Sequence, residues 1–248
     1  MSDWIDKCHF GDCRELMPQF PAGIADAVIT DPPYGDTSLL WDKQCVGWTD
    51  HLMRVMKPNA SVWVFCSMRF ASELWRNLEG IGLTYAQEIV WEKQNGSSFH
   101  ADRFRRVHEF AIQFYRGAWA NVYKDPQYTY DARPKTVRRK TRPAHTGHID
   151  NGHYVSEDGG PRLMRSVLEV SNEHGRAFHP TQKPLGILAP LIAYSVPPGG
   201  VVLDPFMGSG TTGIAARRLG RHFVGCENNP ECIDMQTERT RQTDLEIA

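Results

Sequence analysis

The chain has 248 residues, of which 41% are hydrophobic and 23% are charged, and its 28 basic and 29 acidic side chains give a formal net charge of -1. This length and composition are typical of one folded α/β domain and exclude a disordered chain. No apolar run approaches the ~20 residues that a membrane span needs, so we expect a cytoplasmic protein without a membrane partner.

The near-neutral total hides an uneven distribution of charge. Residues 1–92 carry 7 basic and 13 acidic side chains, residues 93–148 carry 12 and 4, and residues 149–248 carry 9 and 12. Basic charge is therefore concentrated in the middle of the chain, between two acidic parts.

Strand-like and helix-like segments alternate along the chain. Strands are expected at residues 25–30, 61–66, 88–92, 109–115, 201–203 and 222–226, and helices at residues 46–56, 70–78, 184–194, 211–219 and 230–242. The helix at residues 184–194 starts on a proline, and Pro190 inside it predicts a kink. Apolar periodicity fades between residues 116 and 176, which resembles an insertion. The alternation predicts an α/β fold with a mostly parallel, Rossmann-like sheet and helices on both faces.

Cysteines and histidines form no pattern typical of a metal site. The six cysteines lack the two-residue spacing of a zinc knuckle or a redox pair, and the histidines have no acidic or cysteine partner at ligand spacing. We therefore expect reduced cysteines that serve as small apolar side chains, and no metal ion.

Residues 201–213, Val-Val-Leu-Asp-Pro-Phe-Met-Gly-Ser-Gly-Thr-Thr-Gly, place a Gly-x-Gly-x-x-Gly pattern between a predicted strand and a predicted helix. Glycines in that position allow a tight turn and let a ligand approach the helix N-terminus. Glu227 lies nineteen residues after Gly208, at the end of the next strand, where a carboxylate can accept hydrogen bonds from both ribose hydroxyls. The loop therefore predicts a ligand that contains a nucleoside.

Asp204 distinguishes between two ligands of that kind. A carboxylate beside the loop would repel the pyrophosphate of a nicotinamide dinucleotide, whereas it suits a ligand that carries an ammonium and a sulfonium charge. S-Adenosylmethionine has both charges and is the predicted cofactor. A nicotinamide-dependent oxidoreductase remains the alternative that the glycine pattern alone allows.

The tetrapeptide Asp31-Pro32-Pro33-Tyr34 follows its own strand and should reach the same edge of the sheet as the glycine loop. The Asp31 carboxylate and the Pro32 carbonyl can each accept one hydrogen of an exocyclic amine on adenine or cytosine, which frees the nitrogen lone pair. Tyr34 offers a flat face for stacking, and a base inside a duplex must be flipped out to reach it. Taken alone, Asp-Pro-Pro also fits an ordinary turn.

Together these motifs resemble those of the DNA amino-methyltransferases, which modify N6 of adenine or N4 of cytosine. The resemblance rests on Asp31-Pro32-Pro33-Tyr34, on His179-Pro180-Thr181-Gln182-Lys183-Pro184, and on residues 204–212. Their order is similar to that of the permuted beta group. The resemblance implies a class I S-adenosylmethionine-dependent methyltransferase, built as a single catalytic domain over residues 1–248 with a basic target-recognition region inserted at residues 94–176.

The resemblance also implies roles for individual residues. The tetrapeptide Asp31, Pro32, Pro33 and Tyr34 would be catalytic, and its aspartate favours adenine N6, with cytosine N4 as the alternative. A C5-cytosine enzyme needs a cysteine nucleophile, usually after proline, and the sequence has no Pro-Cys pair. Lys183 fits a solvated loop position equally well. The cofactor would be bound by Asp12, Cys13, Asp31, Thr181, Lys183, Asp204, Phe206, Gly208, Ser209, Gly210, Thr211, Thr212, Glu227 and Asn228.

A run of six cations in ten residues is the predicted contact with double-stranded DNA, because basic side chains neutralise phosphates and arginine can bind guanine. A solvated basic loop is the alternative. We also consider a homodimer, a cognate restriction nuclease as partner, and, in another class, a non-catalytic DNA-binding regulator with the same fold. The six cations are Arg133, Lys135, Arg138, Arg139, Lys140 and Arg142.

Overall fold

The computed structural model describes residues 3–35, 42–97, 101–138, 153–172 and 182–247, without the side chains of residues 95–97, 138, 153–154 and 241–247. The chain divides into two compact units, one formed by Met1–Asp125 and Ser166–Ala248 and the other by Pro126–Arg165. Within the described ranges, no helix is both long enough and apolar enough to cross a membrane.

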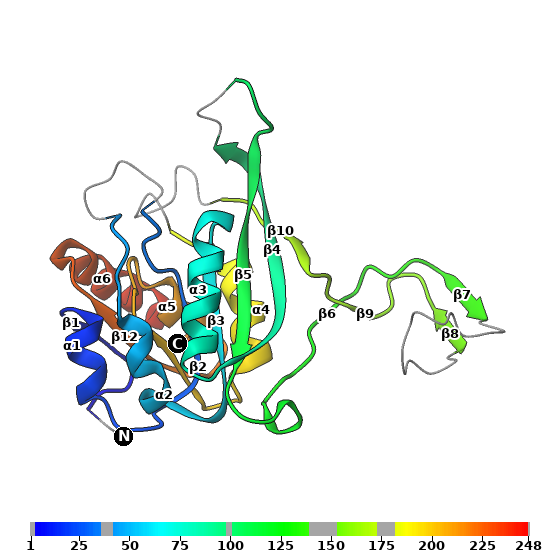
Figure 1. The fold of residues 1–248 in the computed structure, drawn as a ribbon. Coiled ribbons are helices and arrows are strands. Elements are labelled where there is room, and N and C mark those ends of the chain that lie inside the picture. Colours follow the sequence, from blue (N-terminus) through cyan, green and yellow to red (C-terminus); the bar gives the residue numbers. More distant parts are fainter. Residues whose placement is uncertain (1–2, 36–41, 98–100, 139–152, 173–181, 248) are drawn as a thin grey trace. The chain divides into compact units, whose positions relative to one another are not determined.

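The first unit is built on an eight-stranded sheet with the strand order β1-β12-β11-β2-β3-β5-β4-β10 (Figure 1). Neighbouring strands pair in parallel, except that β5 runs antiparallel to both β3 and β4. The predicted α/β fold with a mostly parallel sheet is confirmed. The strands are β1 (Lys7–Phe10), β2 (Ala25–Thr30), β3 (Met56–Cys66), β4 (Thr84–Ser97), β5 (Arg106–Tyr115), β10 (Val167–Glu169), β11 (Val201–Asp204) and β12 (His222–Glu227).

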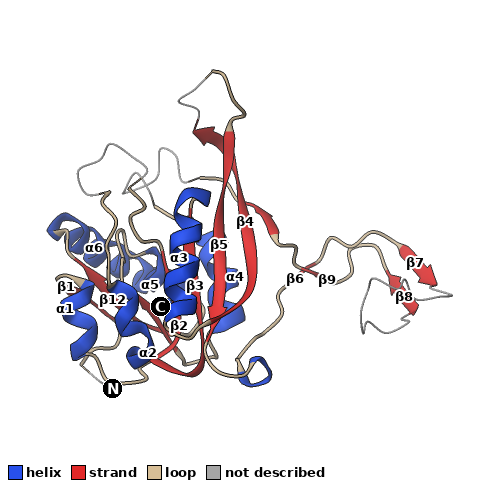
Figure 2. Cartoon of the chain, in the orientation of Figure 1, coloured by secondary structure: helices blue, strands red, loops and turns tan. Residues whose placement is uncertain are grey.

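Helices cover both faces of this sheet, with α3 in front of it and α4 behind it in Figures 1 and 2. Successive residues of a strand point to opposite faces, so Val64 packs in the core that contains Leu74 of α3, and Phe65 packs in the core that contains Leu191 of α4. The helices are α1 (Cys13–Leu16), α2 (Leu52–Val55), α3 (Met68–Gly80), α4 (Leu185–Ser195), α5 (Thr211–Arg218) and α6 (Pro230–Ile247), with 3₁₀ turns at Met17–Gln19, Trp48–His51 and Trp119–Asn121.

Most predicted elements coincide with observed ones, and the differences have local causes. Residues 46–56 form a 3₁₀ turn followed by the short α2, and Met56 already begins β3, so the single helix predicted there is wrong. Pro184 caps α4 from outside, while Pro190 lies inside the helix. The sequence did not predict β1 and α1, because four residues are too few to show a period.

Residues 94–176, predicted as one inserted region, are divided among three places. The end of β4 and the whole of β5 form a hairpin in the central sheet, and β10 pairs with β4 at the edge of that sheet. Residues 126–165 form the second unit. The recognition role of this region stays a prediction.

The second unit consists of two short antiparallel strand pairs. β6 (Tyr128–Thr129) pairs with β9 (Arg162–Leu163), and β7 (Lys135–Arg138) pairs with β8 (His153–Ser156). Asp131 and Arg162 form an ion pair at 3.5 Å, and Ala132 is buried between exposed neighbours. The unit therefore buries little apolar surface of its own.

The topology of the sheet places the predicted motifs together. Strands β11, β2 and β3 lie side by side and run parallel, so their carboxyl ends meet at one edge of the sheet. Asp204 ends β11 and Asp31 directly follows β2. Two carboxylates that are 173 positions apart thus reach the same edge.

Candidate active site

A cavity of about 410 Å³ lies at this edge, a size within the ordinary range of small-molecule sites. Its lining comes from the loops after β1, β2, β11 and β12 and from the segment before α4. Gly210 belongs to the same glycine loop without lining the cavity, and Thr181 lies outside the described residues. The predicted residues that line the cavity are Asp12, Cys13, Asp31, Pro33, Lys183, Asp204, Phe206, Gly208, Ser209, Thr211, Thr212, Glu227 and Asn228.

The three glycines of the loop have different structural roles. Gly208 and Gly210 have φ angles of 50° and 79°, in the left-handed region that favours glycine, and Gly210 directly precedes α5. Gly213 lies inside α5 where a Cβ atom would stand 2.6 Å from Met207 Cε. Gly208 and Gly210 therefore shape the turn, and Gly213 lets α5 pack closely against Met207.

Two buried side chains of α6 hold this loop in place. Gln236 Nε2 donates a hydrogen bond to the Gly208 carbonyl at 2.6 Å, and Arg239 donates to the Ser209 carbonyl and to Thr211 Oγ1, the latter at 3.1 Å. The sequence analysis missed both residues. Their spacing of three places them on one face of a helix, which is the signal that points to a shared partner.

Asp204 is anchored by its own chain. Its carboxylate accepts hydrogen bonds from Thr212 Oγ1 at 2.6 Å, Thr30 Oγ1 at 2.7 Å and the Phe206 amide at 3.1 Å. The side chain is only 4% exposed, and burial raises its pKa to about 6. The carboxylate is thus mostly ionised at neutral pH and can attract a cation in the cavity through space.

Glu227 joins the glycine loop to the start of α6. Its Oε2 accepts a hydrogen bond from the Gly208 amide at 2.7 Å, and its Oε1 accepts one from the Asn229 amide at 2.8 Å. A carboxylate has about four lone-pair sites, so both oxygens can still accept a hydroxyl. Its place on the cavity lining fits the predicted ribose contact, with Asn228 exposed beside it.

At the end of β1, Asp12 caps α1 and accepts hydrogen bonds from the Arg14 amide, at 2.8 Å, and from its guanidinium, which lowers the pKa of Asp12. Cys13 is buried, and Cys45 is half-buried beside it. Within the described ranges, Asp12, Cys13 and Cys45 are close enough to hold a metal ion, their ligand atoms lying within 4.8 Å of one another. Asp12 is, however, already engaged by Arg14.

Hydrogen bonds from two side chains hold Asp31 of the tetrapeptide Asp31-Pro32-Pro33-Tyr34. One Asp31 oxygen accepts a hydrogen bond from the Tyr34 hydroxyl, and the other accepts one from Lys183. The Tyr34 ring stacks on Phe70, with a centroid distance of 5.6 Å and an angle of 28°, so one of its faces is covered. Pro32 is buried. Burial raises the pKa of Asp31, and Lys183 opposes that shift.

Lys183 is a buried member of the site, and its alternative as a solvated loop residue is wrong. The side chain is 9% exposed, and its ammonium contacts Asp31 and lies 3.2 Å from Glu109 Oε2. The sequence analysis missed Glu109. The available signal was its position in β5, where it lies on the same face as Ala111 and Gln113 and is the charged member of that set.

The basic run is only partly described. Arg133 and Lys135 are exposed in the second unit, and Arg138 belongs to β7 without a described side chain. Arg139, Lys140 and Arg142 lie outside the described residues. Their contact with DNA stays a prediction.

The fold and the cavity define a class I methyltransferase, and residues 25–238 match the model of the N6/N4 methyltransferase family, described as DNA methylases. The chain belongs to that family. It is a DNA methyltransferase that uses S-adenosylmethionine and is of the N6-adenine or N4-cytosine type. The predicted family, fold and cofactor are confirmed, and the nicotinamide alternative is set aside.

Relatives and solved structures agree with this assignment. The chain is 26% identical to the Type II methyltransferase M.HinfI of Haemophilus influenzae over 98% of this chain and 70% of the relative. It is 26% identical to M1.MboII of Moraxella bovis over 93% and 94%. The M1.HpyAVI–SAM complex has a TM-score of 0.65 at 26% identity, covering 94% of this chain and 98% of that one. The cytosine-N4-specific PvuII methyltransferase has a TM-score of 0.65 at 19% identity over 94% and 85%, which supports the fold.

Proposed function

We propose that the protein transfers a methyl group to N6 of an adenine that is flipped out of double-stranded DNA. The observation that carries this proposal is the Asp31 carboxylate, which lines the cavity together with Asp204 and Glu227. Tyr34 and Lys183 each occupy one lone pair of Asp31, so lone pairs remain for a hydrogen of the target amine.

The residues of the cavity have separate tasks in this reaction. S-Adenosylmethionine, when bound, supplies the methyl group on a positively charged sulfur. Glu227 would accept hydrogen bonds from its ribose, and Asp204 would attract its positive charge. Asp31 orients the target amine and takes its proton. Because burial raises the pKa of Asp31, this carboxylate accepts a proton more readily than an ordinary aspartate.

Adenine is favoured over cytosine by the aspartate at position 31, since in similar enzymes this position leans toward adenine when it is aspartate and toward cytosine when it is serine. Cytosine N4 is the second candidate. Both bases present an exocyclic amine next to a ring nitrogen, and the PvuII enzyme, which shares the fold, is cytosine-N4-specific.

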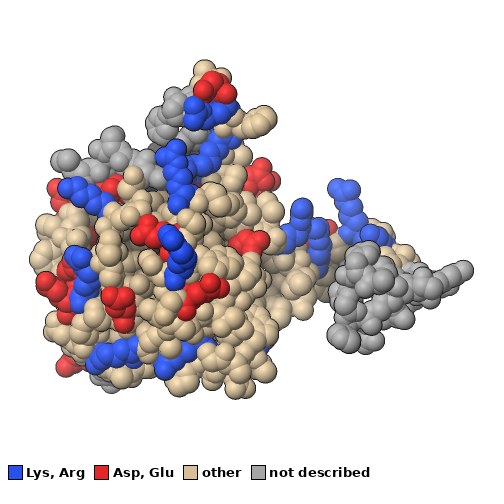
Figure 3. Space-filling view, in the orientation of Figure 1, with Lys and Arg blue, Asp and Glu red and all other residues tan. Residues whose placement is uncertain are grey.

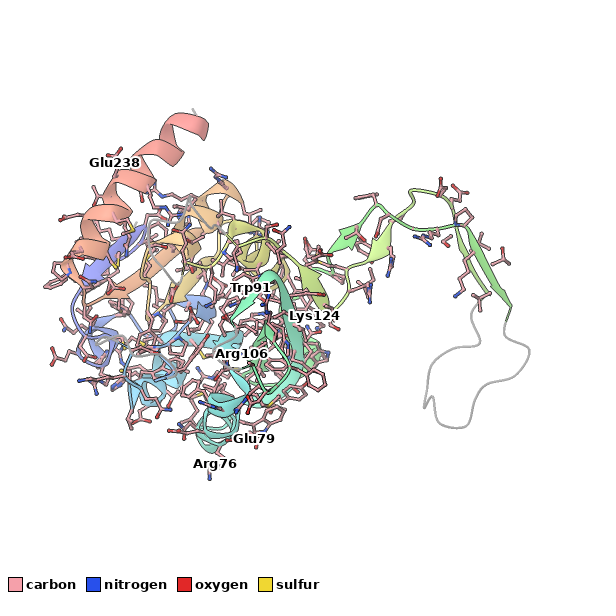
Figure 4. All side chains as sticks on the ribbon, turned by 90° about the horizontal axis from the view of Figure 1, so that it is seen from above. Arg76, Glu79, Trp91, Arg106, Lys124 and Glu238 are labelled. Atoms are coloured by element: carbon pink, nitrogen blue, oxygen red, sulfur yellow. The ribbon has the colours of Figure 1, made fainter. Side chains whose placement is uncertain are left out.

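The β4–β5 hairpin supports a duplex as the substrate. Because β5 runs antiparallel to β3, the turn of this hairpin lies toward the edge at which β3 ends and the cavity lies. The turn presents Arg103, Phe104 and Arg105, all exposed, with Phe104 102% exposed. Figure 3 shows basic side chains along the hairpin, and Figure 4 labels Arg106 at the start of β5. We propose that the arginines bind phosphates and that Phe104 contacts a base.

We also propose further partners for the protein. The Type II names of M.HinfI and M1.MboII support a cognate restriction nuclease. The six cations of the basic run would add phosphate contacts from the second unit. A cytoplasmic location and a homodimer stay predictions.

Incubation of the protein with labelled S-adenosylmethionine and mixed-sequence duplex DNA, followed by nucleoside analysis, tests this proposal. We expect labelled N6-methyladenine, and no label with the Asp31→Ala variant. Labelled N4-methylcytosine would move the assignment to the second candidate. A folded, cofactor-binding protein that labels neither base would instead favour the non-catalytic DNA-binding regulator.

A further inference from the structure

Four charged side chains, one buried and three partly buried, form a continuous series of ion pairs beside the cavity. The Lys183 ammonium lies between Asp31 and Glu109, and Lys93 pairs with the other oxygen of Glu109. Their side chains are 23%, 9%, 17% and 18% exposed for Asp31, Lys183, Glu109 and Lys93. In space the order is Asp31, Lys183, Glu109 and Lys93, so anions and cations alternate and each charge has a neighbour of opposite sign.

Strand pairing and aromatic rings hold this series of ion pairs in place. In the β4–β5 ladder Trp91 stands opposite Glu109, and residues opposite each other point to the same face, as does Lys93 two positions along β4. Lys93 Nζ lies 4.5 Å from the centre of the Trp91 ring, and Lys183 Nζ lies 5.9 Å from it. The Phe65 ring lies 5.2 Å from Lys183 Nζ. These rings limit where both ammonium groups can move.

The surroundings shift the pKa values of Glu109, Lys183 and Asp31 differently. Burial raises the pKa of Glu109, but Lys183 and Lys93 outweigh it and bring the pKa to about 2. Burial lowers the pKa of Lys183, but Asp31 and Glu109 outweigh it, and the pKa is raised. Burial also raises the pKa of Asp31; Lys183 lowers it and the nearby Glu109 raises it, and the net shift is upward, opposite to that of Glu109. Lys183 and Glu109 therefore stay ionised while Asp31 is the group that can gain a proton.

We propose that Glu109 is a positioning residue for methyl transfer: by sharing the Lys183 ammonium, it prevents Lys183 from pairing with Asp31 alone and so keeps Asp31 available to the target amine. This inference rests on the proposed role of Asp31 and is independent of which base is modified. As the methyl–nitrogen bond forms and the methyl–sulfur bond breaks, the proton of the amine N–H passes to an Asp31 oxygen, and the charges balance. Lys183 then faces one ionised carboxylate, Glu109.

Glu109 Oε2 supports a role beyond packing. It is buried and, among the described residues, has the Lys183 ion pair at 3.2 Å but no partner in hydrogen-bond geometry. A carboxylate held in this way interacts with Lys183 mainly through charge, and a buried charge acts at close range with little screening. Three further titratable groups face this series of ion pairs within the described ranges: Tyr34, the buried Cys66 thiol and Asp204.

Two variants should shift the pKa of Asp31 in opposite directions. Glu109→Gln keeps the shape of the side chain and removes its charge, so Lys183 pairs with Asp31 alone and the pKa of Asp31 falls. Lys93→Met removes one of the two cations that offset the charge of Glu109, so the pKa of Asp31 rises. Glu92→Gln is the matched control, because Glu92 is the exposed neighbour of Lys93 on β4.

The test measures single-turnover methyl transfer to duplex DNA between pH 5 and 9, at saturating S-adenosylmethionine, together with cofactor affinity. We expect Glu109→Gln to keep cofactor affinity within about twofold, to lose at least about tenfold in rate at pH 7.5, and to move the acid limb of the profile to lower pH. Lys93→Met should move that limb to higher pH, and Glu92→Gln should leave it in place. A slower Glu109→Gln enzyme with an unmoved acid limb would show a merely structural role.

A second readout does not depend on catalysis. Carbon-13 NMR titration of the Asp31 carboxyl, assigned with Asp31→Asn, reports its pKa without DNA. We expect a lower pKa in Glu109→Gln and a higher one in Lys93→Met, and equal values in all proteins would overturn the inference. If the wild-type protein methylates no DNA, the proposed function fails while this titration still decides the role of Glu109.

Discussion

Asp204 should weaken the folded state at neutral pH, because the site keeps a charged carboxylate where burial favours a neutral one. Burial raises its pKa to about 6, from an ordinary 3.8. Below pH 3.8 the carboxyl is protonated in both the folded and the unfolded chain, and the effect vanishes. Above it, the unfolded chain loses the proton first, so the free energy of unfolding falls as the pH rises to about 6 and then levels off.

The size of the effect follows from the shift. A shift of this size corresponds to about 3 kcal/mol at pH 7.5 and to about half of that at pH 5. Asp204→Asn removes the charge and keeps the shape. It also disturbs hydrogen bonds from Thr30 and Thr212, which costs about 1 kcal/mol at every pH. The variant should therefore be more stable than the wild type at pH 7.5, with an advantage that shrinks by about 1.4 kcal/mol at pH 5.

Urea unfolding of both proteins at the two pH values, without cofactor, measures this difference. The same variant should bind S-adenosylmethionine more weakly, because the charge that destabilises the empty protein attracts the cationic ligand. A difference in unfolding free energy that is the same at both pH values would refute the assigned burial of the charge. Unchanged cofactor affinity would refute its role in the site.

Three further predictions concern the loop, the cysteines and the hairpin. Gly210→Ala should lower stability by about 1–2 kcal/mol and weaken cofactor binding, because its φ angle is 79° and a Cβ atom would lie 2.8 Å from Gln236 Cγ; thermal unfolding and calorimetry measure both. A hydrogen bond from the Cys13 thiol lowers the pKa of Cys45 to about 7, so Cys45 should react with iodoacetamide at pH 7.5 before the other cysteines. Bound S-adenosylmethionine should slow this reaction, because Cys45 lines the cavity. Peptide mapping that finds another thiol modified first would contradict the prediction. Phe104→Ala should weaken duplex binding about tenfold or more while cofactor affinity stays the same, because Phe104 is fully exposed at the hairpin turn. Phe104→Leu should bind DNA with an affinity between those of the wild type and Phe104→Ala. Equal DNA binding by the wild type and both variants would show that the hairpin turn does not contact DNA.

Motifs that lie within one strand, loop and helix could be predicted from the sequence. The strand at Ala25–Thr30 was predicted with its exact bounds, and the loop of Gly208 and Gly210 was placed correctly before α5. In both cases a buried parallel strand ends at an abrupt loop, and residues that line the cavity follow within a few positions. The local sequence is therefore sufficient to predict the strand, the loop and the residues that follow it.

Contacts between distant segments could not be predicted in the same way. Glu109 reaches Lys183 only because β5 lies antiparallel beside β3 in the sheet. The register between β4 and β5 then places Lys93 next to Glu109. Arg239 reaches Ser209 only because α6 packs against α5. Strand order and helix packing decide such contacts, and single-sequence periodicity carries no information about either.

The central claim is that Asp31 acts on the target amine in the transfer step and contributes little to the affinity for the cofactor. Its most direct test compares Asp31→Ala with the wild type in cofactor binding by calorimetry and in single-turnover transfer to duplex DNA. We expect S-adenosylmethionine to bind with nearly unchanged affinity and N6-methyladenine to disappear. Retained methyl transfer by the variant would contradict the claim.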